Sequence, residues 1–395
     1  MRYVLLIFPS VFSKAKKEKL VENIRRKLLT RMIKISSMKS EENYIILDVC
    51  DIVEAKCALV GMFGIDKIGI AKKTQNDFSN VVRAIVATGK KIIMPREKFL
   101  VKVKLYKNHD SKTVNYEAKD VEFASSGQLV SELSGRFARP ATTKDTVVRI
   151  IESYIDNRYA YVCVKTTQSF GGLPFNSQNY KLMCSIHSPL SFLSCFASMR
   201  CGFLPKIFLL YTDEEDLRNK VKLAKPIIDM IDQRRYEVST ARINLSPALD
   251  VSTEKMVLES IYCKILTLLP GEVVIVPLTA AIFPTWYVNS IVKDIVSVGK
   301  IPWTPLIFAS NTIDYVSMTS GVATHRGITE VESLANPINS RFHQPYLALD
   351  AMIDRKSYEK QKQMINDISH RALKTLNTVS FKIRSNYVHD IIDSI

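Results

Sequence analysis

Three short polar clusters carry side chains that could do chemistry. His187 is followed by Ser188 and Ser191, a spacing that could pair an acid–base group with a hydroxyl. The alternative is a hydrogen-bonded structural histidine after a buried strand. The acids Asp213-Glu214-Glu215-Asp216 could hold Mg²⁺, or they could cap the helix that follows, where acids are favoured. His325-Arg326 could contact phosphate or belong to a polar loop. No GxSxG, HExxH or Walker pattern occurs in the sequence.

The seven cysteines do not form a recognisable metal or disulfide pattern. They lie at positions 50, 57, 163, 184, 195, 201 and 263, with no CxxC pair among them. A zinc site or a disulfide framework needs closer and more regular spacing. We therefore expect reduced thiols and no metal site.

The positive charge is concentrated in the first 170 residues. The chain has 55 lysines and arginines against 39 acids, a net charge of +16. Residues 1–170 hold 31 of these cations and 18 of the acids, a net charge of +13. A charge that served only solubility would be spread along the chain. The asymmetry predicts a surface that binds the phosphates of RNA or DNA, with a solvated lysine-rich surface as the alternative.

The chain shows no segment typical of membrane insertion or export. Its apolar start is interrupted by Pro9 and is followed by Lys14, Lys16 and Lys17, which is the reverse of a signal peptide's order. No stretch reaches the roughly 18 apolar residues that span a bilayer. The start predicts a buried first strand, and we expect a soluble, cytoplasmic protein with no membrane partner.

Hydrophobic periodicity predicts the elements that position these residues. In the first part, residues 3–8, 43–49 and 65–71 predict strands, and residues 13–32 and 52–63 predict helices. Residues 77–90 and 120–133 predict helices, and 98–106, 146–151 and 160–165 predict strands; in 98–106 lysines alternate with apolar residues. Beyond a polar connector at 168–178, strands alternate with helices, which predicts a mostly parallel sheet covered by helices. Residues 358–393 predict an amphipathic, largely helical end.

Several short motifs, in order along the chain, resemble the 4-thiouridine tRNA synthetases, or tRNA sulfurtransferases. Phe8-Pro9 with Ser13-Lys14 resembles their F-P-E-x-x-x-K-S opening, and 58–65 resembles their helix-to-turn pattern. Residues 99–104 with Asn108-His109-Asp110 resemble the THUMP motif F-x-V-R-V-K-R-x-G-K-H-D. Gly171-Gly172-Leu173-Pro174 resembles the family's G-G-x-P linker, and Met199-Arg200-x-Gly202 resembles its M-x-x-R-G stretch.

The resemblance implies an α/β and α+β multidomain protein. It implies a ferredoxin-like N-terminal domain over residues 1–72, a THUMP domain over 73–168, a linker over 169–178 and a Rossmann-like PP-loop domain with a parallel sheet over 179–395. In that family the first two domains grip the acceptor end of tRNA, and copies often pair through this half. We therefore expect tRNA or another structured RNA as the partner and treat a homodimer as an open possibility.

The nucleotide loop that the family uses is degenerate in this chain. The family motif is S-G-G-x-D-S, whose glycines let backbone N–H groups approach the phosphates of ATP. The aligned residues match only at the last position, Leu190 replaces the acid, and Pro189 lacks an N–H donor. The degenerate loop comprises Ile186, His187, Ser188, Pro189, Leu190 and Ser191.

Two further motif losses agree with a degenerate site. The family's T-G-E region falls at Pro277-Leu278-Thr279, and its G-Q-x-x-S-Q region falls at the apolar and aromatic residues 282–287. No cysteine follows Cys263, although the family's sulfur-carrying cysteine lies late in the domain. The resemblance thus implies no catalytic residues and no cofactor. We expect ATP and Mg²⁺ only if the nucleotide site lies at other residues than the ones aligned with the family's motif.

The candidate RNA contacts are basic residues of the first 140 positions. They supply phosphate contacts without a base code, which favours recognition of RNA shape, and Phe137 could pack on a base or sugar. These contacts are Lys14, Lys16, Lys17, Arg25, Arg26, Lys98, Lys102, Lys104, Lys107, His109, Arg136 and Arg139. Three function classes stay open: an RNA-binding pseudoenzyme, an active ATP-dependent tRNA-modifying enzyme with a divergent site, and a scaffold that binds no RNA.

Overall fold

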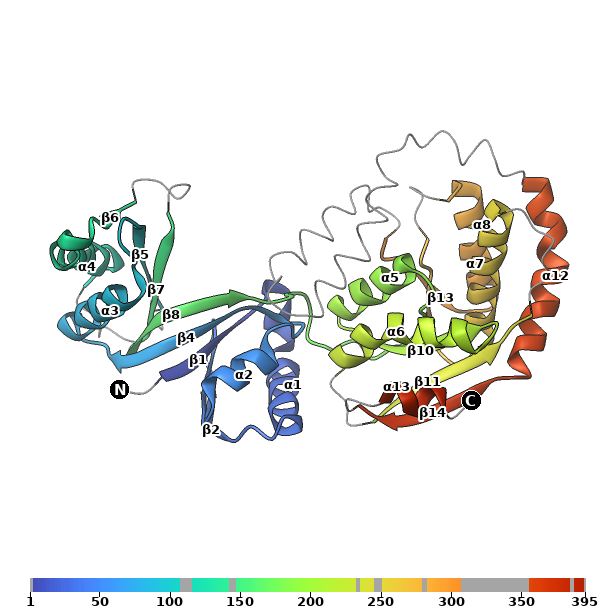
Figure 1. Ribbon diagram of the computed structural model, residues 1–395, viewed down its shortest axis with the longest axis horizontal. Coiled ribbons are helices and arrows are strands. Elements are labelled where there is room, and N and C mark those ends of the chain that lie inside the picture. Colours follow the sequence, from blue (N-terminus) through green and yellow to red (C-terminus); the bar gives the residue numbers. More distant parts are fainter. Residues whose placement is uncertain are drawn as a thin grey trace. The chain divides into compact units, whose positions relative to one another are not determined.

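The structure is a computed structural model (Figure 1) that describes residues 3–106, 116–141, 147–231, 235–244, 251–278, 283–306, 355–383 and 387–393. The chain forms two compact units. The first unit comprises residues 1–9, 31–60 and 66–168, and the second comprises residues 10–30, 61–65 and 169–395. A boundary at residue 72 lies within the strand Ile65–Gln75.

The first unit is built on an eight-stranded sheet with the order β2-β3-β1-β4-β8-β7-β5-β6. Most neighbouring strands are antiparallel, but β5 runs parallel to both β7 and β6. The strands are β1 (Tyr3–Pro9), β2 (Ile35–Ser40), β3 (Ile45–Val49), β4 (Ile65–Gln75), β5 (Lys98–Leu105), β6 (Arg139–Pro140), β7 (Arg149–Ile155) and β8 (Tyr159–Gln168).

Two helices of the first unit cover one face of this sheet at β5, β7 and β8, as Figure 1 shows for α3 (Phe78–Ile92) and α4 (Ala118–Glu132). Asp77 begins α3 by accepting a hydrogen bond from the backbone N–H of Ser79. In β5, Phe99, Val101 and Val103 are buried against these helices, and the lysines between them lie on the other face. The predicted half-buried strand with a basic face is confirmed. A shorter helix, α2 (Ile52–Leu59), packs near β1 and β3.

The second unit contains a six-stranded sheet with the order β13-β12-β9-β10-β11-β14. All its strand pairs are parallel except β11 with β14. The strands are β9 (Lys181–Ser185), β10 (Leu204–Tyr211), β11 (Arg235–Arg242), β12 (Val273–Ile275), β13 (Ile301–Trp303) and β14 (Asn377–Lys382). The helices are η1 (Val11–Lys16), α1 (Lys17–Thr30), α5 (Pro189–Arg200), α6 (Glu214–Met230), α7 (Val251–Leu268), α8 (Thr285–Ser297), α12 (Arg355–Leu373) and α13 (Tyr387–Ile392).

The sequence did not predict the strands β2, β6, β13 and β14, and two of these show why. The end of the chain was expected to be largely helical, but β14 interrupts it and pairs antiparallel with β11. Val379 and Phe381 are the buried positions of β14, a period of two that a short strand between two helices shows only weakly. Periodicity did not predict β2 either, because this edge strand is polar and only its partner β3 is fully buried.

The connector at residues 168–178, which contains Gly171 and Gly172, packs closely against other segments of the second unit. Gly171 exchanges backbone hydrogen bonds with the 61–65 turn, accepting from the Gly64 N–H at 2.7 Å and donating to the Ile65 carbonyl at 2.8 Å. Gly172 has a φ of +74°, and a Cβ there would lie 2.3 Å from the Arg200 carbonyl oxygen. Only glycine fits this contact, by which the connector packs directly against the end of α5.

Candidate functional site

The degenerate loop lies where open α/β sheets usually bind their ligands. After β9 the chain continues to β10 on one side, and β12 lies on the other side of β9. The crevice outside the carboxyl ends of strands at such a reversal is the general ligand position of these sheets. His187 and Ser188 follow β9 there, and Ser188 begins α5 as its N-cap.

The polar groups of this loop are bonded to one another. The Ser191 hydroxyl accepts hydrogen bonds from the backbone N–H groups of His187 and Ser188, each at 2.9 Å, and donates to the Ser188 carbonyl at 2.8 Å. The Ser188 side chain in turn accepts from the Ser191 N–H at 3.2 Å. A phosphate cradle needs free N–H groups that point outward. With these two donors occupied and none on Pro189, the loop does not fit the phosphates of ATP.

His187 pairs with an acid that sequence reasoning did not find. Its Nε2 lies 3.0 Å from Oε1 of Glu259 on α7, and its ring stacks on Tyr262 with centroids 3.6 Å apart. Both side chains are buried, at 7% exposure for His187 and 4% for Glu259. No described residue bonds to His187 Nδ1 or Glu259 Oε2. The histidine is a hydrogen-bonded interior residue rather than the partner of a serine nucleophile, because the Ser191 hydroxyl is used by the backbone.

The acidic run caps a helix. The Asp213 side chain accepts a hydrogen bond from the Asp216 N–H at 2.9 Å at the start of α6, and this bond lowers the Asp213 pKa. Asp216 pairs with Lys220 at 2.7 Å. Within the residues that the structure describes, no cluster of acids, histidines and cysteines could hold a metal ion. The capping interpretation is confirmed for Asp213. His325-Arg326 lies outside the described residues.

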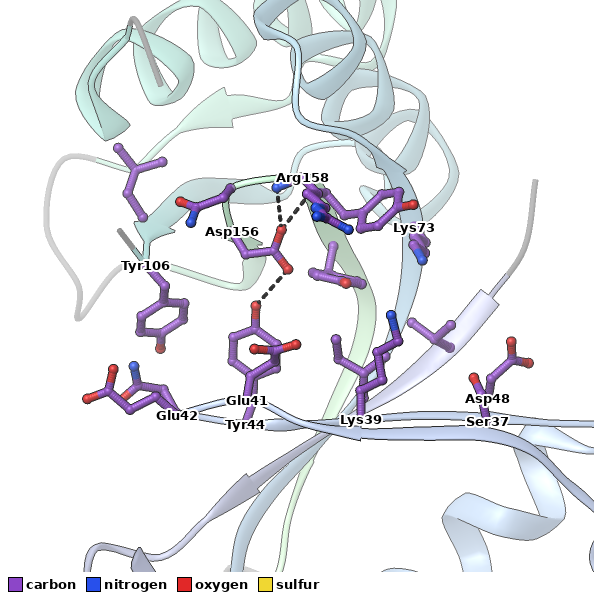
Figure 2. Close-up of a pocket in the computed structure, with 17 residues that line it drawn as sticks. Ser37, Lys39, Glu41, Glu42, Tyr44, Asp48, Lys73, Tyr106, Asp156 and Arg158 are labelled. Atoms are coloured by element: carbon purple, nitrogen blue, oxygen red, sulfur yellow. Dashed lines mark hydrogen bonds between the residues drawn. The ribbon is translucent and has the colours of Figure 1, made fainter. Parts of the chain in front are cut away.

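A cleft of about 480 Å³ in the first unit was not predicted from the sequence (Figure 2). Its lower side in Figure 2 carries Lys39 of β2 and Tyr44, just before β3. Its upper side carries Asp156 and Arg158 of the β7–β8 turn, with Tyr106 beside them. These residues are far apart in the sequence, and the curved sheet brings them together. No motif marks such a cleft.

Hydrogen bonds to Asp156 define the cleft. Its Oδ1 accepts from the backbone N–H groups of Arg158 and Tyr159 at 2.8 and 2.7 Å, and its Oδ2 accepts from the Tyr44 hydroxyl at 3.2 Å. Burial, followed by the Asp156 charge, raises the pKa values of Tyr44 and Tyr161 well above the ordinary tyrosine value. These phenols stay protonated at neutral pH, so the Tyr44 hydroxyl can act as the donor to Asp156.

The candidate RNA contacts of the second unit lie on η1 and α1. Lys14, Lys16 and Arg25 are exposed, whereas Lys17 and Arg26 are half-exposed. The Arg26 guanidinium pairs with Glu22, which also pairs with Lys19, so part of the charge on this helix is neutralised locally. Val11 and Phe12 beside these lysines are more than 70% exposed.

Five of the candidate contacts that the structure describes lie in the first unit. Lys98 and Lys104 are exposed on β5, and Lys102 is half-exposed between them. Arg136 and Arg139 are exposed after the end of α4, and Arg139 in β6 is the register partner of Lys98 in β5. Arg136 also donates from Nη1 to the carbonyls of Lys90 and Ile93, at 2.9 and 3.2 Å.

Those bonds mean that Arg136 supports the end of α3, and fewer of its N–H groups can reach a phosphate. Phe137, which follows it, is 69% exposed in a left-handed conformation with a φ of 54°. Lys107 and His109 lie outside the described residues.

Comparisons with known proteins agree with this architecture. No protein-family model matches the chain. The structure superposes on a 4-thiouridine synthetase in complex with RNA and bound ATP, with a TM-score of 0.65 and 11% identity over 97% of this chain and all of that chain. The chain shares the fold of a 4-thiouridine synthetase. It also superposes on PH1313 from Pyrococcus horikoshii, with a TM-score of 0.56 and 18% identity over 86% of this chain and 99% of that one.

The sequence supports the same relationship over a shorter range. A protein named "Probable tRNA sulfurtransferase" from Methanosarcina mazei is 25% identical over 159 residues, which is 40% of this chain and 38% of that protein. The chain thus matches well under half of that relative's length. The resemblance to this group and the predicted α/β and α+β multidomain fold class are confirmed. No helix in the described residues is long and apolar enough to cross a membrane.

Proposed function

We propose that the protein binds tRNA, or another structured RNA, and no longer performs ATP-dependent sulfur transfer. The fold is that of a synthetase whose structure contains both RNA and ATP. The two halves of the proposal rest on different parts of the chain. RNA binding rests on the basic residues of positions 1–140, and the loss of catalysis rests on the loop after β9.

The exposure of the basic residues supports RNA binding. All ten candidate contacts that the structure describes are exposed or half-exposed, and none is buried. In the described part of the chain no carboxylate pairs with Lys98, Lys102 or Arg139. Such cations bind phosphate by releasing counterions, which adds affinity at low salt. The exposure of these cations, together with the net charge of +13 over residues 1–170, is the observation that carries the proposal of RNA binding.

The closed loop supports the loss of ATP chemistry. The N–H groups of His187 and Ser188 are already paired with the Ser191 hydroxyl, and Leu190 is buried where the motif has an acid. A triphosphate would have to displace these bonds without gaining glycine-lined N–H donors. The one residue that matches the motif, Ser191, has a structural role here, because its side chain accepts from the Ser188 N–H and completes the capping box at the start of α5.

Two assays on one preparation test both halves. Filter binding of unmodified tRNA from 50 to 300 mM salt measures the affinity and its salt dependence. Pyrophosphate release from ATP, with and without tRNA, measures nucleotide chemistry. We expect tRNA binding that weakens steeply with salt and no pyrophosphate release. Pyrophosphate release that tRNA stimulates would instead establish an active modifying enzyme. Absence of tRNA binding at low salt would favour the third function class, a scaffold that binds no RNA. Sedimentation of the same samples tests whether two copies pair, which the sequence left open.

A further inference from the structure

We propose that a groove between α7, α8 and α12 of the second unit binds a small aliphatic α-amino acid. The three helices lie together in Figure 1, and one face of each lines the groove. The groove has a volume of about 170 Å³, close to the roughly 150 Å³ of a cavity that holds benzene. It is too small for a nucleotide, so this inference is independent of the proposed RNA binding.

The floor of the groove is apolar. Ile291, Ile295 and Ile365 are at most 5% exposed and supply branched aliphatic surface. Burial raises the pKa of the Cys263 thiol well above its ordinary value, so this side chain is neutral and extends the same surface. An aliphatic group placed here would be removed from water, which favours binding. The floor therefore selects a ligand with a short aliphatic part.

A hydroxyl network holds one end of the groove in shape. The Ser260 hydroxyl lies 2.9 Å from the hydroxyls of both Tyr287 and Tyr358, and it donates to the Met256 carbonyl at 2.8 Å. The rings of Tyr287 and Tyr358 meet edge to face, with centroids 5.2 Å apart. Since Ser260 and Tyr358 line the groove, little ordering is needed when a ligand enters.

Opposite charges on two walls match the two charges of an amino acid. Lys264 of α7 is half-buried and Asp294 of α8 is exposed, and neither forms an ion pair with another residue that the structure describes. The third charged residue of the lining, Lys362, pairs with Glu359 at 2.9 Å. The described part of the lining thus keeps one unpaired cation and one unpaired anion. They suit a ligand that carries both a carboxylate and an ammonium group, rather than a simple anion or amine.

The test uses L-leucine as the probe. Isothermal titration calorimetry of the unaltered protein, with L-leucine added to about 10 mM, should give a saturable heat, since a ligand of this size binds in about the millimolar range or more tightly. Tryptophan fluorescence locates the site. The Trp286 ring centroid lies 5.7 Å from that of Tyr358, and the chain has two tryptophans, so Trp303→Phe leaves Trp286 as the single reporter. L-Leucine should change its fluorescence.

Three analogues of leucine test which of its groups are recognised, all on the unaltered protein. 4-Methylpentanoate lacks the ammonium group, and 3-methylbutylamine lacks the carboxylate. Each should bind about 10-fold or more weakly than L-leucine, because it leaves Asp294 or Lys264 without a partner. Glycine keeps both charges but has no aliphatic part for the floor, and it should also lose about 10-fold or more.

Two substitutions on the walls test the assigned charges. Asp294→Asn and Lys264→Gln should each weaken L-leucine binding by about 3- to 10-fold, the effect of an ion pair that solvent partly screens. The matched control is Lys293→Gln, which removes an exposed lysine of α8 that does not line the groove and should leave the affinity unchanged.

No heat and no change in Trp286 fluorescence on addition of L-leucine would overturn the proposal. If 4-methylpentanoate or 3-methylbutylamine bound as tightly as L-leucine, the groove would not be an amino-acid site. L-Leucine affinity that both wall substitutions leave unchanged would equally contradict this assignment.

Discussion

The Tyr44 hydroxyl donates to the Asp156 carboxylate at 3.2 Å and thereby connects the β3 side of the first unit to the β7–β8 turn. The two residues are 112 positions apart, and Tyr44 is only 1% exposed. The same carboxylate accepts the N–H groups of Arg158 and Tyr159. One acid thus satisfies three donors and fixes the width of the cleft.

Replacing Asp156 should destabilise the first unit more than removing the Tyr44 hydroxyl. Asp156→Ala leaves three donors without their acceptor, and we expect a loss of about 1–3 kcal/mol in the free energy of unfolding. Tyr44→Phe removes one bond and should cost about 0.5–1.5 kcal/mol. Urea unfolding followed by circular dichroism measures both. Glu41→Gln, an exposed acid on the cleft's rim, is the matched control and should change stability by less than about 0.5 kcal/mol; equal effects of all three would contradict this role of Asp156.

The buried tyrosines predict a loss of stability at alkaline pH. Burial, then nearby carboxylates, raises the pKa values of Tyr44, Tyr154 and Tyr161 above the ordinary value of about 10. A raised pKa in the folded state contributes stability that is fully present below pH 10 and is lost as the pH rises above it. Each such tyrosine should lower the free energy of unfolding by up to about 1.4 kcal/mol per pH unit above 10.

Absorbance of phenolate at 295 nm, recorded with and without urea, checks this behaviour. The tyrosines of the folded protein should ionise at higher pH than those of the unfolded chain. Tyr44→Phe should reduce by one the number of tyrosines that ionise late in the folded protein. Coincident titration curves in the two states would show the prediction to be wrong.

Alanine substitutions at two glycines should change the stability of the protein in opposite directions. Gly172→Ala places a Cβ 2.3 Å from the Arg200 carbonyl oxygen at a φ of +74°, so it should destabilise the second unit by at least about 1–2 kcal/mol. Gly127→Ala lies inside α4 with no atom within 4 Å of the new Cβ and should stabilise by about 0.5–1 kcal/mol. Thermal unfolding measures the two shifts. A Gly172→Ala protein as stable as the unaltered one would mean that the connector is not held as described.

Much of the fold was predictable because its signals are local. The alternation of Phe99, Val101 and Val103 with lysines marked β5, and the Gly171-Gly172 pair marked the junction after β8. The cleft could not be predicted, since Tyr44, Tyr106 and Asp156 meet only through sheet curvature. The Glu259 partner of His187 was likewise hidden, because nothing in a helical sequence tells which strand end its side chain will face.

Charge removal on β5 tests the RNA surface of the first unit. Lys102→Gln/Lys104→Gln should weaken tRNA binding and reduce the slope of log affinity against log salt by about 0.7–0.9 for each phosphate that is no longer neutralised. Lys206→Gln/Lys222→Gln removes the same charge from exposed positions of the second unit and should leave the slope nearly unchanged. Filter binding over a salt series measures both slopes. Equal slopes for the two double variants would indicate that overall charge, rather than this surface, attracts RNA.

The His187–Glu259 pair should contribute to stability rather than to catalysis. Glu259→Ala removes the hydrogen-bond partner of a buried ring nitrogen, and we expect a loss of about 1–3 kcal/mol, the cost of leaving a buried polar group unpaired. Glu259→Gln keeps an acceptor oxygen of the same shape and should recover part of that loss. Urea unfolding ranks the three proteins, and the salt dependence of tRNA binding should be the same for all of them, because the pair lies inside the second unit at 7% and 4% exposure. A variant that retained full stability but lost a nucleotide-dependent signal in the pyrophosphate assay would place this pair in a working site, and the interpretation of the loop as closed would have to be abandoned.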